Sequence, residues 1–377
     1  MEKIIIFGAQ GYALGTCKAI KTVYPEKEII CFLVSKVGGI DPEILDGLPV
    51  RELEPFSKEL SDSDKRDIEI IIATPENIQS EIEVILDGYG LTNHSRLTAA
   101  IWENLMEAYH AKLGIFKPLR AFEFGEGMIP KESKDKAYAD FFSQIRIYMA
   151  KFFKDKVLKE NPVLPDYMTP IQVGAALTDE RVADITDDTG ENISKKNVNY
   201  CETTALYWMW KNVLEKNVPD DCTKYFGLAQ YRRMFTFSEG DLFRIKENDI
   251  DVVLPYPMPY EPDINAHHNR YIKDADWNAL LTALAEISPE YAKAYKEILN
   301  QKFMYNYNVI VAKKEVLKDY CAWIFPILER TEELSVPKGN ERADRYIGYM
   351  AETLETLYFM YNKAKLKIAH TGCKLFS

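Results

Sequence analysis

The chain has 377 residues, of which 47% are hydrophobic and 28% charged, a composition typical of a globular protein with a large core. This length suggests two domains, or one large domain with an appendage. The formal net charge of -11 argues against a nucleic-acid partner held by bulk positive charge, and no apolar run approaches the roughly 20 residues that span a bilayer.

The amino terminus reads MEKIIIFGAQG, and its apolar run is too short, and too soon followed by a glycine turn, to be a signal peptide. The six cysteines are scattered along the chain without a CxxC pair. We therefore interpret them as reduced thiols of the core rather than as disulfides or a zinc site. Both observations favour a cytoplasmic protein.

The first part of the chain alternates short apolar segments with helical segments, which indicates an α/β fold with a parallel sheet of the Rossmann type. Strands are expected at residues 3–7, 28–34, 49–53 and 67–73. A helix that follows the first strand is expected to end near residue 23. Two more helices are expected at residues 76–86 and 96–113.

Three glycines follow the first strand, Gly8, Gly11 and Gly15. Their spacing, GxxGxxxG, departs from the GxGxxG of dinucleotide-binding folds, and the second strand ends at Ser35 with no acid to bind a ribose 2′-hydroxyl. NAD binding is therefore a weak interpretation. The glycines either let the first helix pack closely on the sheet, or bind the phosphate of a nucleotide or nucleotide sugar at the helix N-terminus.

A charged stretch at residues 130–136, PKESKDK, marks a predicted domain boundary. We expect a first domain over residues 1–130, a linker over 131–143 and a second domain over 144–377. In the second domain, strands are expected at residues 145–149, 225–229, 251–254 and 309–312, a loop at 154–170, and helices at 199–215, 277–287, 314–329 and 344–361. Because strands come early and two long helices come last, this domain is also predicted to be α/β.

The stretch at residues 170–235 combines three features. An acidic, glycine-bearing turn at 184–192 leads into a helix rich in Trp and Tyr, and a short apolar strand at 225–229 then ends in QYRR. Adjacent guanidinium groups at the end of a buried strand are suited to bind phosphate oxygens bidentately. The alternative is that Arg232 and Arg233 are solvated residues of a sheet edge.

Six segments carry a resemblance to a known family. They are PIQVGAALTD, DDTGENISKKNVNYCETTALYWMWKN, YFGLAQYRRMF, DVVLPYPMPYEP, NYNVIVAKKEVLKDYCAWIFPILE and RADRYIGYMAETLETLYF. In these segments, from about residue 145 to the C-terminus, the chain resembles bacterial glycosyltransferases of capsule and O-antigen gene clusters. That family was long described as a domain of unknown function and is now understood as galactofuranosyltransferases. The part before about residue 143 resembles only loosely the small Rossmann-like domains attached to other bacterial sugar-modifying enzymes.

The resemblance implies a GT-A-like second domain that transfers galactofuranose, with inversion, from UDP-galactofuranose to a lipid-linked oligosaccharide of capsule or O-antigen synthesis. The negative net charge favours no nucleic-acid partner, and peripheral association with the inner face of the membrane stays open. Many GT-A enzymes hold the diphosphate through a metal bound by Asp-x-Asp at a strand end, where this chain has QYRR. No cofactor is therefore assigned, although Mg²⁺ or Mn²⁺ is left open.

The candidate substrate-binding residues come mostly from these segments. They are Gly174, Ala175, Asp187, Asp188, Asn192, Tyr231, Arg232, Arg233, His268 and Arg345. The acidic turn has three possible roles: contact with the donor sugar, binding of Mg²⁺, or a solvated turn without a ligand. We favour contact with the donor sugar. For the neighbours His267 and His268, polar surface residues are the simpler interpretation, although the resemblance makes one of them a candidate acceptor contact.

An inverting transfer needs a base near the acceptor hydroxyl, and the candidates are Glu352, Glu202, Asp188 and His268. Asp188 lies in the turn assigned to the donor, and His268 lies on a loop, which holds a base less rigidly than a helix does. Glu352 flanks the apolar stripe of the last long helix, one turn after Gly348, where the missing side chain would leave space; the alternative is an ordinary exposed helical Glu. Glu202 lies three residues after Asn199, a capping-box spacing that explains it structurally, but it also lies on an inward-facing stripe. We predict that Glu352 is the base and keep Glu202 as the second candidate.

Two functions of other classes stay open. A nucleotide-sugar epimerase or dehydrogenase run by the first domain should bind NAD(P). A glycan-binding scaffold should bind a donor without transferring its sugar. The family often has a His near Phe152 and another at Gln230, and this chain departs from it at both places, which leaves the donor sugar open.

Overall fold

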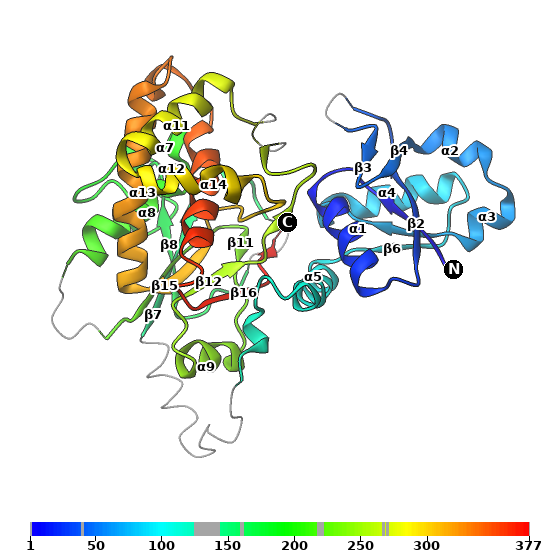
Figure 1. Cartoon of the computed structure of the whole chain (residues 1–377), viewed down its shortest axis with the longest axis horizontal. Coiled ribbons are helices and arrows are strands. Elements are labelled where there is room, and N and C mark those ends of the chain that lie inside the picture. Colours follow the sequence, from blue (N-terminus) through cyan, green and yellow to red (C-terminus); the bar gives the residue numbers. More distant parts are fainter. Residues whose placement is uncertain are drawn as a thin grey trace. The chain divides into compact units, whose positions relative to one another are not determined.

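The computed structural model describes residues 2–38, 41–123, 144–158, 162–216, 222–265, 268 and 271–376 (Figure 1). The chain divides into two compact units. The first comprises Met1–Phe116, Met258–Glu261 and Ser377, and the second comprises Lys117–Pro257 and Pro262–Phe376. The stretch at residues 130–136, where the sequence places the domain boundary, lies outside the described residues, so that boundary stays a prediction.

The first unit is built on a six-stranded sheet of order β3-β4-β2-β1-β5-β6. Its strands are β1 (Lys3–Phe7), β2 (Glu28–Val34), β3 (Ile44–Leu45), β4 (Leu48–Glu52), β5 (Glu69–Ile72) and β6 (His94–Arg96), with β13 (Met258–Pro259) outside this sheet. Its helices are α1 (Gly11–Val23), α2 (Leu53–Glu59), α3 (Asp62–Asp67), α4 (Glu76–Gly88) and α5 (Ala99–Leu113). Strands β4, β2, β1, β5 and β6 run parallel, while β3 pairs antiparallel with β4. The expected parallel sheet is confirmed.

Both faces of this sheet are covered, because successive residues of β1 point to opposite sides. Ile4 and Ile6 pack in one hydrophobic cluster with Leu14 of α1. Ile5 packs in another cluster with Leu86 of α4. The uninterrupted apolar run of β1 is thus that of a strand buried on both faces.

The glycines after β1 are crowded by other parts of this unit. A Cβ atom on Gly8 would lie 2.8 Å from the carbonyl oxygen of Ala73, and the φ of 126° at Gly8 also favours glycine. A Cβ atom on Gly15 would lie 2.4 Å from the ring of Trp102 on α5. These contacts give both glycines a packing role. Binding of a nucleotide by Gly8, Gly11 and Gly15 stays a prediction.

The second unit contains a nine-stranded mixed sheet whose main path is β16-β12-β15-β10-β7-β8-β9, with β11 paired to β10 and β17 to β11. Its strands are β7 (Ile145–Lys151), β8 (Met168–Gln172), β9 (Ile185–Thr186), β10 (Tyr225–Gln230), β11 (Arg233–Met234), β12 (Val252–Pro255), β15 (Ile310–Lys313), β16 (Ile368–Thr371) and β17 (Lys374–Leu375), with β14 (Phe303–Met304) outside this sheet. Strands β10, β7, β8 and β9 run parallel, so their carboxyl ends meet at one edge.

Helices cover this sheet and lie between its strands in the chain (Figure 1). They are α7 (Asn197–Tyr200), α8 (Thr203–Met209), α9 (Glu239–Glu247), α11 (Asp274–Ile287), α12 (Pro289–Leu299), α13 (Lys314–Leu334) and α14 (Tyr346–Tyr361). The mixture of parallel strands and helices confirms the predicted α/β class. Across the described ranges, no helix is both long and apolar enough to cross a lipid bilayer.

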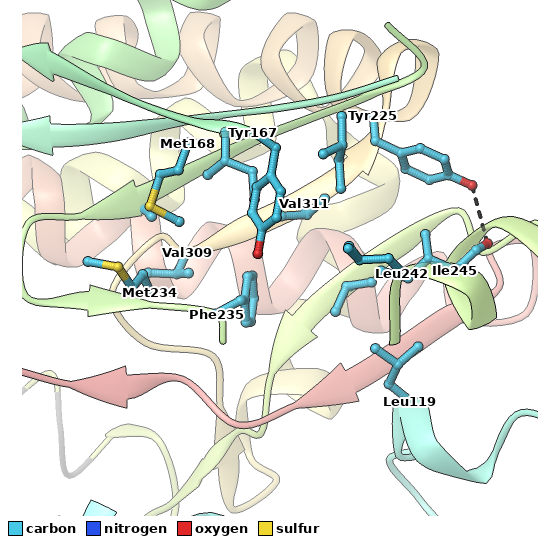
Figure 2. Close-up of a cluster of buried hydrophobic side chains, with 14 of the residues drawn as sticks. Leu119, Tyr167, Met168, Tyr225, Met234, Phe235, Leu242, Ile245, Val309 and Val311 are labelled. Carbon is cyan, nitrogen blue, oxygen red and sulfur yellow. Dashed lines mark hydrogen bonds between the residues drawn. The ribbon is translucent and has the colours of Figure 1, made fainter. Parts of the chain in front are cut away.

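Successive side chains of β7 lie on opposite faces of the second sheet. Ile147 packs into a large hydrophobic cluster, whereas the next residue, Tyr148, contacts the ring of Trp208 on α8 with centroids 5.7 Å apart. Figure 2 shows that cluster, in which Tyr225 of β10 donates a hydrogen bond to the carbonyl oxygen of Ile245 on α9 at 3.4 Å. Helix α9 therefore covers one face and α8 the other.

The C-terminal segment differs from the prediction that the chain ends in helices. After α14 the chain forms β16, which pairs parallel with β12. Its His370 is buried, with Nε2 2.8 Å from the hydroxyl of Tyr305. The loop expected at residues 154–170 is also wrong at its end, because β8 begins at Met168. Both strands are short and depend on pairing partners that the local sequence pattern does not reveal.

The helix expected at residues 199–215 is interrupted. Helix α7 ends at Tyr200, and Cys201 has a left-handed φ of 53° before α8 begins. A Cβ atom on Gly348 of α14 would lie 3.0 Å from Sγ of Cys201. Cys201 therefore fills the space that Gly348 leaves. The prediction of an open space beside Glu352 is wrong.

Asn199 and Glu202 do not form the capping box that their spacing predicted. The side-chain amide of Asn199 donates to the carbonyl oxygens of Arg342 at 3.2 Å and Asp344 at 2.8 Å. This residue thus fixes the segment that precedes α14. Glu202 has other partners, which belong to the candidate site.

Candidate functional site

The carboxyl ends of β7 and β10 carry the first part of the candidate site. Strand β10 turns back directly into β11, because Gln230 pairs with Arg233 across a tight turn. The turn holds Tyr231, whose amide donates to the carbonyl oxygen of Ala150 on β7 at 2.9 Å, and Arg232. Both adjacent arginines are half-buried at the edge where the parallel strands end.

The loop before β15 lies against this hairpin. Gln230 donates from Nε2 to the carbonyl oxygen of Tyr307 at 2.7 Å, and the guanidinium carbon of Arg233 lies 3.5 Å from the Tyr307 ring centroid. Tyr307 and Asn308 have φ values of 79° and 50°, in the left-handed region. Such φ values are unfavourable for a tyrosine, and residues held in them cluster at functional sites.

Glu352 on α14 is buried, so it is not the exposed helical residue that was its alternative. Its Oε2 accepts a hydrogen bond from Nδ2 of Asn306 at 3.1 Å, and it accepts another from the amide of Tyr307. Burial and the nearby Glu202 raise the pKa of Glu352 to about 7, against the opposing effect of those hydrogen bonds and of Arg233. A carboxylate with this pKa is suited to take up a proton near neutral pH.

The loop before β15 also positions Glu202. Its Oε1 accepts a hydrogen bond from Nδ2 of Asn308 at 2.8 Å, and its Oε2 lies 3.8 Å from Nη2 of Arg345. The Nε of Arg345 in turn donates to Sγ of Cys201 at 3.0 Å. One loop therefore positions both candidate acids, each through an asparagine side chain.

A third glutamate, Glu355, is buried one turn further along α14. It is 1% exposed, and neither of its carboxylate oxygens has a hydrogen-bond partner among the described residues. Burial, together with the charges of Glu352 and Glu202, raises the pKa of Glu355 well above its usual range. Glu355 could not be predicted as a buried acid from the sequence, because a single Glu on a long helix usually faces solvent.

The raised pKa of Glu355 should make the free energy of unfolding depend on pH. Folded protein should keep the Glu355 proton at pH values where the unfolded chain, with a pKa near about 4.3, has lost it. The free energy of unfolding should therefore fall as pH rises above about 5, by up to about 1.4 kcal/mol per pH unit from this group. Glu355→Gln should abolish this contribution in denaturant titrations at several pH values.

The exposed Glu297 on α12 provides the matched control for this prediction. The Glu297→Gln variant should follow the wild-type pH dependence, whereas Glu355→Gln should become more stable than wild type as pH rises. Parallel curves for wild type and Glu355→Gln would contradict the assignment of a buried neutral acid.

Asp155, just after β7, is a further acid near the site that was not predicted from the sequence. The backbone amide of Phe152 donates to its Oδ2 at 2.7 Å. Burial raises the pKa of Asp155 to about 6, while that hydrogen bond and the charges of Lys151, Arg232 and Arg345 oppose the shift. Asp155 thus lies within electrostatic reach of two of the predicted arginines.

Asp187, from the acidic turn, is fully buried. Its carboxylate accepts hydrogen bonds from the amides of Gly174 at 2.9 Å and Ala175 at 3.1 Å, and from the hydroxyl of Ser194 at 2.5 Å. These bonds fix two loops to each other and occupy both carboxylate oxygens, which does not fit a Mg²⁺ ligand. Donor contacts by Gly174, Ala175 and Asp187 stay predictions.

Asp188 and Asn192 shape the rest of that turn. Asn192 donates from Nδ2 to the carbonyl oxygens of Asp188 at 3.0 Å and Gly190 at 2.9 Å, and the Asp188 carboxylate lies 3.8 Å from Nη2 of Arg181. In the part of the chain that the structure describes, no three or more His, Cys, Asp or Glu side chains are grouped as metal ligands. Donor contacts by Asp188 and Asn192 stay predictions.

His268 is buried, which corrects the expectation of a polar surface residue. Its Nε2 lies 3.0 Å from the hydroxyl of Thr353, and its ring centroid lies 3.6 Å from that of Trp277. Thr353 follows Glu352 on α14, so His268 packs against the helix of the candidate base. His267 lies outside the described residues.

The structure thus brings both predicted acids and the predicted arginines into one electrostatic group. Glu352 interacts with Glu202 and Arg233, and Arg345 lies beside Glu202. Arg232 joins the group only through Asp155, on which Arg345 acts as well. The acidic turn forms a separate hydrogen-bond network at the ends of β8 and β9. The asparagines that hold the acids were missed, although they belong to the NYN at the start of a segment that carries the family resemblance.

The comparisons with known proteins agree with the resemblance at the level of the family. A family model described as "Domain of unknown function (DUF4422)" matches residues 146–363, which is more than half of the chain. The chain therefore belongs to this family. No curated protein matches the chain.

Among solved structures, the apo structure of the WbbM bifunctional glycosyltransferase is similar at 25% identity with a TM-score of 0.51. The match covers 62% of this chain and 45% of WbbM, so the chain spans less than half of that protein. A second match, at 15% identity, is the methyltransferase FkbM from Methylobacillus flagellatus, and it covers 38% of this chain and 34% of the FkbM chain. Its TM-score of 0.21 is too low to carry an argument. The chain has an α/β fold like that of a glycosyltransferase.

Proposed function

We propose that the second unit is a glycosyltransferase that moves a sugar from a nucleoside diphosphate to a hydroxyl group of a glycan. The observation that carries this proposal is a connected group of charges near the ends of β7 and β10. Glu202 and Arg233 act on Glu352, Arg345 lies beside Glu202, and Arg232 and Arg345 both act on Asp155 just after β7. Sugar transfer expels a diphosphate and removes a proton from the acceptor. This group of residues has cations for the first task and carboxylates for the second.

The arginines are proposed to bind the diphosphate. Guanidinium groups match phosphate oxygens bidentately and stay charged at all relevant pH values. Arg232 and Arg233 come from the hairpin after β10, whereas Arg345 precedes α14. The diphosphate charge would thus be held by arginines at the strand end where GT-A enzymes often hold a metal ion.

Glu352 is proposed as the base, with Glu202 as the second candidate. The acceptor hydroxyl must lose its proton as the new bond forms, and a carboxylate whose pKa is about 7 can take that proton near neutral pH. Two carboxylates in one site also favour the positive charge that develops on an oxocarbenium-like sugar.

For the substrates, we propose UDP-galactofuranose as donor and a lipid-linked glycan of capsule or O-antigen synthesis as acceptor, with inversion at the anomeric carbon. The support is the sequence resemblance, together with the similarity to WbbM, a bifunctional glycosyltransferase. A lipid-linked acceptor would bring the protein to the inner face of the membrane as a peripheral protein.

Calorimetric titration with UDP, UDP-galactofuranose, UDP-glucose and NAD(H) tests the proposal. UDP and UDP-galactofuranose are expected to bind and, at 100 times Kd, to raise the free energy of unfolding by about 2.7 kcal/mol. Binding of NAD(H) without UDP would instead favour an epimerase or dehydrogenase in the first unit. Binding of UDP-galactofuranose with neither transfer nor hydrolysis would favour a glycan-binding scaffold.

A further inference from the structure

An exposed tyrosine ring lies next to the candidate acids. Tyr271 stacks on Tyr349, with ring centroids 4.9 Å apart and an interplanar angle of 27°. Tyr271 is 45% exposed, whereas Tyr349 is partly buried. A single exposed aromatic ring is common on protein surfaces, so its meaning depends on what surrounds it.

Tyr349 connects this stack to the site. It lies on α14 one turn before Glu352, and its hydroxyl interacts electrostatically with Arg345, Glu352 and Cys201. The guanidinium carbon of Arg345 lies 6.0 Å from the Tyr349 ring centroid. The stack therefore offers a solvent-exposed aromatic surface close to Arg345 and Glu352.

A sugar ring is a ligand that fits this surface. One face of such a ring carries mainly C–H groups, and the negative face of an aromatic ring attracts these hydrogens while both apolar surfaces leave water. The phenolic hydroxyl groups can at the same time exchange hydrogen bonds with hydroxyl groups at the edge of the sugar. Tyrosine thus combines the two kinds of contact that a sugar offers.

We propose that the Tyr271–Tyr349 stack is an acceptor subsite, in which one sugar ring of the acceptor glycan lies on Tyr271 and presents a hydroxyl group to Glu352. This inference rests on the proposed function. A general base must lie within hydrogen-bond reach of the hydroxyl that it deprotonates. Because Tyr349 adjoins Glu352 on one helix, a sugar on this stack is the acceptor, and the donor diphosphate is left to Arg232, Arg233 and Arg345.

Saturation-transfer NMR with methyl glycosides of galactose, glucose and N-acetylglucosamine tests the subsite without any need for transfer activity. Wild-type protein should transfer saturation to the ring C–H protons of at least one glycoside. Tyr271→Leu should lose this effect and Tyr271→Phe should retain it. Tyr24→Leu, at a tyrosine of similar exposure in the first unit, should behave as wild type. Absence of saturation transfer in wild type, or its persistence in Tyr271→Leu, would overturn the subsite.

Kinetics separate this proposal from the proposed function. Tyr271→Leu should raise the acceptor KM about 10-fold while the Kd of UDP stays unchanged. An equal rise in the acceptor KM and the Kd of UDP would show a general disturbance and count against an acceptor subsite. Glycoside binding that depends on Tyr271, in a protein that does not bind UDP, would support the sugar subsite and reject the glycosyltransferase.

Discussion

Replacing Glu352 by Gln is expected to lower the turnover number about 10²–10⁴-fold, the usual contribution of a general base. Gln has the size and helix propensity of Glu, and its Oε1 can still accept the hydrogen bond that Asn306 donates at this position. What the variant loses is the ability to take up a proton. The Kd of UDP and the melting temperature should therefore be nearly unchanged, as measured by calorimetry beside a transfer assay.

Two variants serve as controls for this prediction. Glu202→Gln is the closest match, because Glu202 has an equivalent asparagine partner, Asn308. Asp155→Asn tests the carboxyl group that follows β7. If Glu352→Gln turns over normally and one of these variants is inactive, that residue is the base. A large fall in the melting temperature of Glu352→Gln would make Glu352 a structural residue instead.

The same assignment sets the pH dependence of the reaction. A base must be ionised in the free enzyme, so kcat/KM should rise with pH up to about 7 and then level off. Asn306→Leu removes a hydrogen bond that lowers the pKa of Glu352, so it should move this acidic limb to higher pH. Asn308→Leu removes a hydrogen bond to Glu202 instead, so the acidic limb of kcat/KM should stay closer to its wild-type position.

Four of the six strands of the first unit, β1, β2, β4 and β5, could be predicted from the sequence, whereas the short strands β3 and β6 could not. Strand β2 covers Glu28–Val34, the range that the apolar pattern predicts, because a strand buried on both faces is a continuous apolar run. Strand β16 could not be predicted in this way. It is short and contains a buried His370, whose burial depends on Tyr305 far away in the chain.

The candidate site could be predicted in its residue types but not in its connections. Glu352 and Glu202 lie far apart in the chain, and the loop that holds both acids is recognisable only once the sheet is formed. Likewise, Asn199 has the spacing of a helix cap, but its tertiary contact with Asp344 determines its role. Local patterns describe neighbours along the chain, whereas these contacts come from the packing of distant segments.

Arg233→Ala is expected to weaken UDP binding by roughly 1.5–3 kcal/mol, about 10- to 150-fold in Kd, which is the scale of a hydrogen bond to a charged group. Arg232→Ala should have an effect of similar size. The hairpin that carries both arginines is held by its backbone, through the Gln230–Arg233 pair and the bond from Tyr231 to Ala150, so both variants should stay folded. Calorimetric titration with UDP measures the loss.

Conservative variants show whether geometry or charge matters at these positions. Arg233→Lys keeps the positive charge but not the planar fork, so it should restore only part of the affinity that Arg233→Ala loses. Arg330→Ala is the matched control, because Arg330 pairs with Glu286 at an exposed position and should not affect UDP binding. Raising the salt concentration should weaken UDP binding to wild type more than to either alanine variant.

The two arginines should differ in a second effect, which separates a phosphate contact from a general loss of charge. Arg233 stacks on Tyr307 and lowers the pKa of Glu352, so Arg233→Ala should also move the acidic limb of kcat/KM to higher pH. Arg232 acts on Asp155, so Arg232→Ala should leave that limb in place. Unchanged UDP affinity in both alanine variants would reject the arginine clamp. Complete loss of transfer in EDTA, with UDP affinity lost as well, would assign the diphosphate charge to a metal ion.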